Sequence, residues 1–268
     1  MRKNAWVICC CTAVLAAFGT FFRWLQDQVC FEAETGLAVR GSIWPYAVAL
    51  MIVIAAVVLA VVCFRMKNQP HTSFPDSLPA AFAAAQRVRT IGGVVLGALL
   101  AVGGAWLMIS SGTLSSPGLQ RVLAVLAIVT GAAFARQMLA PGDAEATSGA
   151  VVCVSMPIVL LAFWLIVSYK VNIINPTISA YAVEILALCA ALIAFYQLAG
   201  FAYGRPKAIK SIFWSQFAAF LCITALPDDR AGGQQLMLAA IAGILVFQSY
   251  LTASNIRPAV SGPVGGVQ

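Results

Sequence analysis

Residues 43–64 read IWPYAVALMIVIAAVVLAVVCF, a run of 22 positions that contains no charged side chain. A helix of about 20 apolar residues is long enough to cross the hydrocarbon core of a bilayer, which is about 30 Å thick. Seven other runs in the chain have a similar character. We therefore predict about eight membrane-spanning helices, over roughly residues 5–24, 43–64, 91–110, 121–140, 150–169, 179–203, 211–226 and 234–253.

The overall composition supports the same fold class. Hydrophobic residues make up 62% of the 268 positions and charged residues only 9%, whereas soluble domains are about 45–50% apolar and about 25% charged. A soluble fold of this size has too few polar residues to cover its outer surface, but lipid removes that requirement. We predict an all-α, polytopic membrane bundle that forms one domain over residues 1–268, with the lipid bilayer as its surroundings.

The lysines and arginines predict the orientation, because cytoplasmic loops carry an excess of both. If the N-terminus is cytoplasmic, 11 of the 16 fall on the inner side and five on the outer side. The inner set is Arg2, Lys3, Arg65, Lys67, Arg87, Arg89, Arg136, Arg205, Lys207, Lys210 and Arg257, and the outer set is Arg23, Arg40, Arg121, Lys170 and Arg230. We expect a cell-membrane protein with both termini in the cytoplasm. The net charge of +7 then reflects topology, and no nucleic-acid partner is expected.

Three segments allow further predictions: the first apolar run, the outer loop 25–42 and the inner loop 66–90. The apolar run from Ala5 is followed by Arg23 and Trp24 without a cleavage site, so we predict a retained first span and not a signal peptide. The outer loop 25–42 is acidic and long enough for a short lid. The inner loop 66–90 predicts either an interfacial helix capped by Asp76 or Ser77, or an N-terminal extension of the third span.

Glu184 is the one acidic residue that we place inside a span. A charge near the bilayer centre is costly and marks a functional site by default, so Glu184 is a candidate contact for a substrate or a cation. The alternative is structural: an ion pair with Lys170, Arg23 or Arg121, or contact with interfacial water.

Amide side chains recur at one depth, one to two turns from the predicted cytoplasmic ends of the last three spans. Such a ring predicts a cavity that binds substrate. Amides also join neighbouring helices by hydrogen bonds, and the pattern favours that interpretation. The candidates are Gln197, Gln216 and Gln248, with Ser215 and Ser249 beside them.

Small residues at four-residue spacing predict close helix packing, because they let two backbones approach each other. The third span presents Gly93, Gly97, Ala101 and Ala105, and the fourth presents Ala127, Gly131 and Ala135. We expect these faces to pack within one chain; dimerisation is the alternative.

No reaction-specific motif is present, and the single histidine, His71, excludes histidine-based zinc sites and Ser-His-Asp triads. We expect no enzyme activity, no cofactor and no metal site. The favoured function is a small-solute transporter or permease, or a membrane component of a transport complex. The alternative is a non-catalytic structural or regulatory subunit that binds another membrane protein or forms a homo-oligomer. A transporter predicts a hydrated cavity that reaches Glu184 or the glutamines, whereas a subunit predicts solid packing there.

Overall fold

The computed structural model of the chain describes residues 2–30, 42–68, 72–83, 86–140, 148–173 and 178–258. Within these ranges the fold is all-α and contains eight long helices. They are α1 (Arg2–Val29), α2 (Trp44–Lys67), α4 (Gln86–Ser110), α5 (Pro117–Leu139), α6 (Ser148–Asn172), α7 (Ile178–Ala202), α8 (Ala208–Thr224) and α9 (Gly232–Ser254). Each predicted span coincides with the body of one long helix. Of the predicted outer loop 25–42, residues 31–41 lie outside the described residues, and residues 25–29 belong to α1.

The helices have the length and composition of membrane spans. Seven of the long helices in the described ranges are long and apolar enough to cross a bilayer. The eighth, α8, has 17 residues, and a rise of 1.5 Å per residue gives it a length of about 25 Å. The predicted fold class, an all-α bundle of membrane-spanning type, is confirmed, and a full crossing by α8 stays a prediction.

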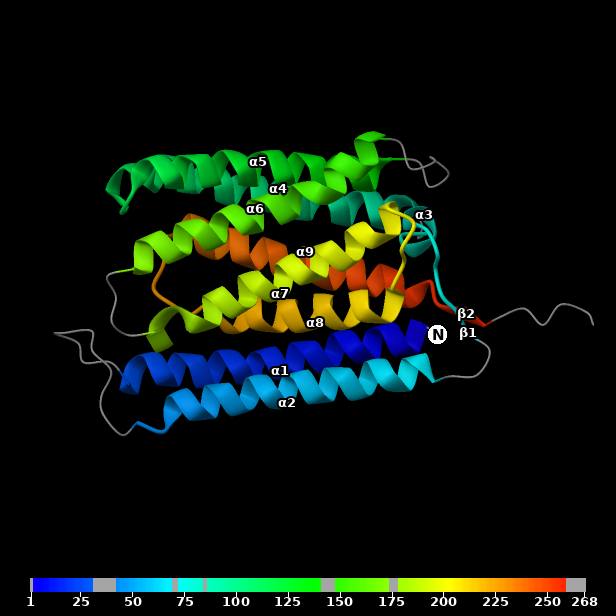
Figure 1. Cartoon of the computed structure of the whole chain (residues 1–268), viewed down its shortest axis with the longest axis horizontal. Helices are drawn as coiled ribbons and strands as arrows, with labels where there is room; N and C mark the ends of the chain where they lie inside the picture. Colours follow the sequence, from blue (N-terminus) through cyan, green and yellow to red (C-terminus); the bar gives the residue numbers. More distant parts are fainter. Residues whose placement is uncertain are drawn as a thin grey trace, which may run out of the picture.

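Successive long helices run in opposite directions through the bundle (Figure 1). The start of α1 and the end of α9 therefore lie at one end, here termed the terminal end. There the two-residue strands β1 (Thr72–Ser73) and β2 (Arg257–Pro258) pair antiparallel. Residues 111–116, which include the 3-10 turn η1 (Ser111–Thr113), and residues 225–231 lie at the opposite end, here termed the pocket end.

Helices α8 and α9 form the centre of the bundle. Among the described residues, the large exposed hydrophobic side chains lie on or beside α1, α2 and α4–α7, and none lies on α8 or α9. Phe220 on α8 and Leu245 on α9 are completely buried. The outer helices therefore present their valines, isoleucines and leucines to lipid. Most residues of α8 are buried among the neighbouring helices, so a helix shorter than the others can lie there.

The small-residue faces of α4 and α5 lie against each other within the chain. A Cβ atom at Gly97 would approach the backbone oxygen of Gly131 to 2.5 Å, and one at Gly131 would approach that of Gly97 to 2.4 Å. Ala135 lies beside Gly97, and Ala101 beside Gly131. The two backbones are thus in direct contact at positions where only glycine fits.

At its ends, the α4–α5 contact departs from the strict four-residue pattern and follows the helical repeat of 3.6 residues per turn. Gly93 packs against Met138, and Ala127 packs against Gly104, which is outside the pattern. Ala105, which belongs to the pattern, is exposed. A step of four residues rotates a helix by about 400°, so a strict i+4 stripe drifts about 40° per step. By residue 105 the stripe has left the interface, and the i+3 step to Gly104 restores it.

The segment before α4 combines parts of both expectations, since a helix follows Ser77 and α4 extends N-terminally beyond the predicted span 91–110. It contains a separate helix, α3 (Leu78–Ala81), of four residues, and α4 begins at Gln86. Leu78, Ala81 and Phe82 are buried in the bundle, and Asn255 Nδ2 donates a hydrogen bond of 2.8 Å to the Ala81 carbonyl. The segment therefore packs into the bundle against α7 and beside the end of α9. Ser77 occupies the N-cap position of α3 but makes no side-chain cap hydrogen bond.

Gly97→Ala tests the α4–α5 contact. Alanine favours helix by about 1 kcal/mol over glycine, but its Cβ would meet the Gly131 carbonyl, so we expect a net loss of about 1–3 kcal/mol. The matched control is Gly118→Ala in α5, where a Cβ meets nothing within 4 Å. Thermal unfolding in detergent micelles should show a lower midpoint for Gly97→Ala and an equal or higher one for Gly118→Ala. Equal midpoints for the two variants would contradict the contact.

Candidate functional site: a charged pocket at one end of the bundle

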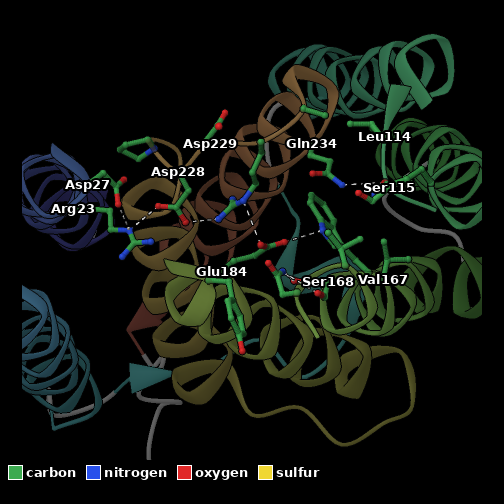
Figure 2. A pocket seen from close by; sticks show the side chains of 18 of the residues that line it. Arg23, Asp27, Leu114, Ser115, Val167, Ser168, Glu184, Asp228, Asp229 and Gln234 are labelled. Atoms are coloured by element: carbon green, nitrogen blue, oxygen red, sulfur yellow. Dashed lines mark hydrogen bonds and ion pairs between the residues drawn. The ribbon is translucent and has the colours of Figure 1, made fainter. Parts of the chain in front are cut away.

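Five charged side chains form an alternating chain of ion pairs at the pocket end. Arg23 Nε lies 2.6 Å from Asp228 Oδ1 and 3.8 Å from Asp27 Oδ1. Arg230 pairs with the second oxygen of Asp228, and its Nε lies 3.3 Å from Glu184 Oε2. Figure 2 shows Arg23 and Asp228 pointing toward one another, with Glu184 farther along the same row. The chain joins α1, α7 and the connection between α8 and α9.

Glu184 is held on its other side by α6. Trp164 Nε1 donates a hydrogen bond of 3.1 Å to Glu184 Oε1, and the Ser168 side chain also hydrogen-bonds to this carboxylate. Trp164 and Ser168 are four residues apart and therefore share one face of α6. The indole ring of Trp164 is completely buried, so this donor is fixed by packing. Each oxygen of Glu184 thus has a defined partner.

Four of the five charges are shielded from solvent, whereas a quarter of the Asp27 side chain is exposed. The exposed fraction of the side chain is 1% for Arg23, 6% for Asp228 and Arg230, and 9% for Glu184. An unpaired charge at such a position is strongly destabilising, whereas a paired and hydrogen-bonded one is tolerated. The alternation of sign therefore allows four buried charges to share a small volume.

Neighbouring polar contacts fix the connection that carries Asp228 and Arg230. Thr20 Oγ1 on α1 donates 3.1 Å to the Ile223 carbonyl at the end of α8, which also accepts a hydrogen bond of 3.1 Å from the Leu226 amide. Gln235 Nε2 on α9 donates 3.2 Å to the Asp228 carbonyl. Gln26 Oε1 accepts a hydrogen bond of 2.9 Å from Arg23 Nη1. Both the backbone and the charged ends of this connection are held.

A pocket of about 680 Å³ opens beside the ion chain. Arg23, Asp27, Glu184, Asp228 and Arg230 line one part of it. On the other side lie Ser115 and the pair Gln120–Gln234, in which Gln234 Nε2 donates 3.0 Å to Gln120 Oε1 across α9 and α5 (Figure 2). Asp229 is exposed at the rim. A volume of this size is typical of sites for small molecules.

The pocket carries an excess of negative charge and an unused donor. Its lining holds four carboxylates, Asp27, Glu184, Asp228 and Asp229, against the two guanidinium groups of Arg23 and Arg230, a formal balance of 2 − 4 = −2. Arg230 Nη1 and Asp27 Oδ2 are buried without a hydrogen-bond partner in the part of the chain that the structure describes. A bound molecule with a cationic group and an acceptor oxygen matches this surface.

The structure separates the glutamines that share one depth. Gln216 on α8 and Gln248 on α9 are both buried, and Gln216 Nε2 donates 2.9 Å to Ser249 Oγ on α9. Gln197 lies on α7 and lines a different hollow, on the lateral face of the bundle. Gln216 therefore joins two helices, as the alternative interpretation expects. The substrate-binding role of the three glutamines stays a prediction.

The counter-charge of Glu184 was missed from the sequence. The ion pair of the structural alternative does form, but its basic partner is Arg230 and not Lys170, Arg23 or Arg121. Asp228, Trp164, Gln120 and Gln234 were also not recognised as members of a site. One signal pointed to them: residues 228–230 place three consecutive charges between two apolar helices, in a chain with only 9% charged residues. Glu184 itself, selected from the sequence, lies in the pocket.

Comparison with known proteins identifies no relative of this chain. No protein-family model, no curated protein and no solved structure matches this chain. The site also shows no cluster of three or more His, Cys, Asp or Glu side chains able to hold a metal ion, within the described residues. Its function is therefore inferred from the charges, the volume and the contacts of the pocket.

Arg23→Gln tests the ion chain. The substitution removes the counter-charge that α1 supplies to Asp228, and breaking a buried pair on one side costs about 3 kcal/mol or more. We expect a free energy of unfolding lower by that amount in denaturant titrations in mixed micelles. The matched control is Lys170→Gln, an exposed basic residue in the last turn of α6, which should change stability by less than about 0.5 kcal/mol. Equal effects from both variants would show that the pair does not stabilise the bundle.

Proposed function

We propose that this chain is a small-solute transporter or permease, or the membrane component of a transport complex, and that it binds its solute in the pocket beside Glu184. The observation that carries the proposal is the pocket itself, in which buried charges line a hollow of about 680 Å³ at one end of an apolar bundle. Charged residues within membrane segments mark substrate and ion pathways. A role limited to joining helices requires the ion pairs but not the open volume beside them.

The charge balance supports a cationic solute. Four carboxylates against two guanidinium groups leave an excess of two negative charges on the pocket wall. Asp229 at the exposed rim is the first of these carboxylates that a solute would meet. Glu184 and Asp228 lie deeper and share Arg230. A cation that enters therefore gains attraction throughout the pocket and competes with Arg230 for Glu184 at its base.

Packing at the other end of the helices supports a site that is open on one side only. Gln216 and Gln248 are buried, and the pocket does not extend to them. A transporter alternates access by moving one group of helices against another around a fixed site. With the termini in the cytoplasm, as the basic residues predict, the described conformation is open to the outside of the cell membrane.

The alternative function, a structural or regulatory subunit, receives less support. It requires exposed small-residue faces for a partner helix, but the glycines of α4 and α5 are already packed against each other. The large exposed side chains on the outer helices suit lipid equally well. A cationic solute accounts for more of the described site than a protein partner does.

Asp229→Asn tests solute binding without disturbing the ion chain. The probes are putrescine, choline and lysine, with lactate and succinate as anionic controls. We expect the cations to bind the purified chain in calorimetry and the variant to bind them about fivefold more weakly, because one charge at this range contributes about 1 kcal/mol. The matched control is Asp76→Asn, an exposed carboxylate near the terminal end, which should leave binding unchanged.

Uptake of the cation that binds best, measured in proteoliposomes, then separates transport from binding. Saturable uptake that falls with Asp229→Asn and not with Asp76→Asn supports a transporter. Binding of lactate or succinate in preference to every cation, or equal loss of binding in both variants, would contradict a cationic site. Binding without uptake would contradict the transport function of this chain alone.

A further inference from the structure

A second hollow, of about 720 Å³, opens on the lateral face of the bundle between α6 and α7, close to the terminal end. Its apolar wall is formed by Ile158 and Val159 on α6. Tyr196 and Tyr203 flank it, and each is at least 60% exposed. The hollow thus lies on the surface that the outer helices present to acyl chains, and not on the axis of the bundle.

The rim of this hollow nearest the end of α7 is basic. Arg205 and Lys207 are both exposed and line it, and Gln197 and Ser155 add polar groups. Among the described residues that line it there is no carboxylate. Its charge is therefore opposite to that of the pocket beside Glu184, and the two sites select different ligands.

The backbone fixes the position of Arg205. Helix α7 ends in a turn in which Gly204 adopts a φ of +68° and the Arg205 amide donates 2.7 Å to the Gly200 carbonyl. This is the pattern of a Schellman C-cap, which a glycine in the left-handed region allows. A Cβ at Gly200 would approach the Arg205 carbonyl to 2.9 Å. The turn is thus specified by two glycines, and it carries the basic rim.

We propose that this hollow binds an anionic phospholipid, whose phosphate contacts Arg205 and Lys207 and whose acyl chain lies along Ile158 and Val159. Charge complementarity selects the headgroup, since basic residues at the membrane surface attract anionic lipids. The amphipathic rings of Tyr196 and Tyr203 suit the boundary between headgroups and acyl chains. A soluble anion satisfies the rim but leaves the apolar wall without a ligand. The inference is independent of the proposed transport function.

Native mass spectrometry of the full chain tests the site with phosphatidylglycerol and phosphatidylcholine of identical acyl chains. We expect phosphatidylglycerol to bind more tightly, and the double variant Arg205→Gln/Lys207→Gln to bind it about 30-fold more weakly, from about fivefold per charge. The matched control is Arg65→Gln/Lys67→Gln, a basic pair with the same spacing at the end of α2. It should retain the affinity. A loss of general attraction to the anionic surface would instead weaken binding equally in both double variants.

Two measurements complete the test. Thermal unfolding in detergent without lipid should give both double variants the wild-type midpoint, since all four side chains are exposed. Competition with millimolar glycerol phosphate should leave lipid binding intact, because that anion lacks the acyl chain. Equal loss of lipid in the control pair, no preference for phosphatidylglycerol, or full displacement by glycerol phosphate would each overturn the proposal.

Discussion

Hydrocarbon offers no partner to a charge or to a backbone amide, and this constraint organises the whole molecule. Each unsatisfied polar group there costs several kcal/mol. The described chain therefore places its backbone in helices and collects most of its buried charges at the pocket end, where they alternate in sign from Asp27 to Glu184. Arg89, buried near the terminal end, instead donates a hydrogen bond to the Ala140 carbonyl. The ion chain exists because Glu184 and Asp228 lie too deep to be solvated by bulk water alone.

The short central helix brings these charges inward. Helix α8 ends at Thr224 after 17 residues, so the connection that follows it starts below the ends of its longer neighbours. Asp228 and Arg230 on that connection thereby reach Arg23 on α1 and Glu184 on α7. The pocket consists of the space beyond the end of this short helix and of the charged side chains that extend into that space. A helix as long as its neighbours α7 and α9 would fill that space.

Much of the fold follows from the sequence, because each span contains about 20 apolar residues and loops with basic residues separate the spans. Glu184 was recognised for the same reason: an acid inside an apolar run is conspicuous. Its partner was not, since pairing with Arg230 depends on which helices are neighbours. The sequence shows how far along a helix a residue lies, but it shows less well which way the side chain points around the helix axis. Gln197 and Gln216 therefore share a depth and face different surroundings.

Cysteine labelling measures the central claim most directly: the exposed apolar side chains face acyl chains, whereas the pocket end contacts water. The variants Val95→Cys and Ser115→Cys, made after replacing the eight native cysteines, place thiols at two exposed positions, one midway along α4 and one at the pocket. Maleimide reacts with the thiolate, which does not form in hydrocarbon. In native membranes we predict rapid labelling of Ser115→Cys, and labelling of Val95→Cys only after denaturation. Equal rates for both in intact membranes would contradict a bundle solvated by lipid.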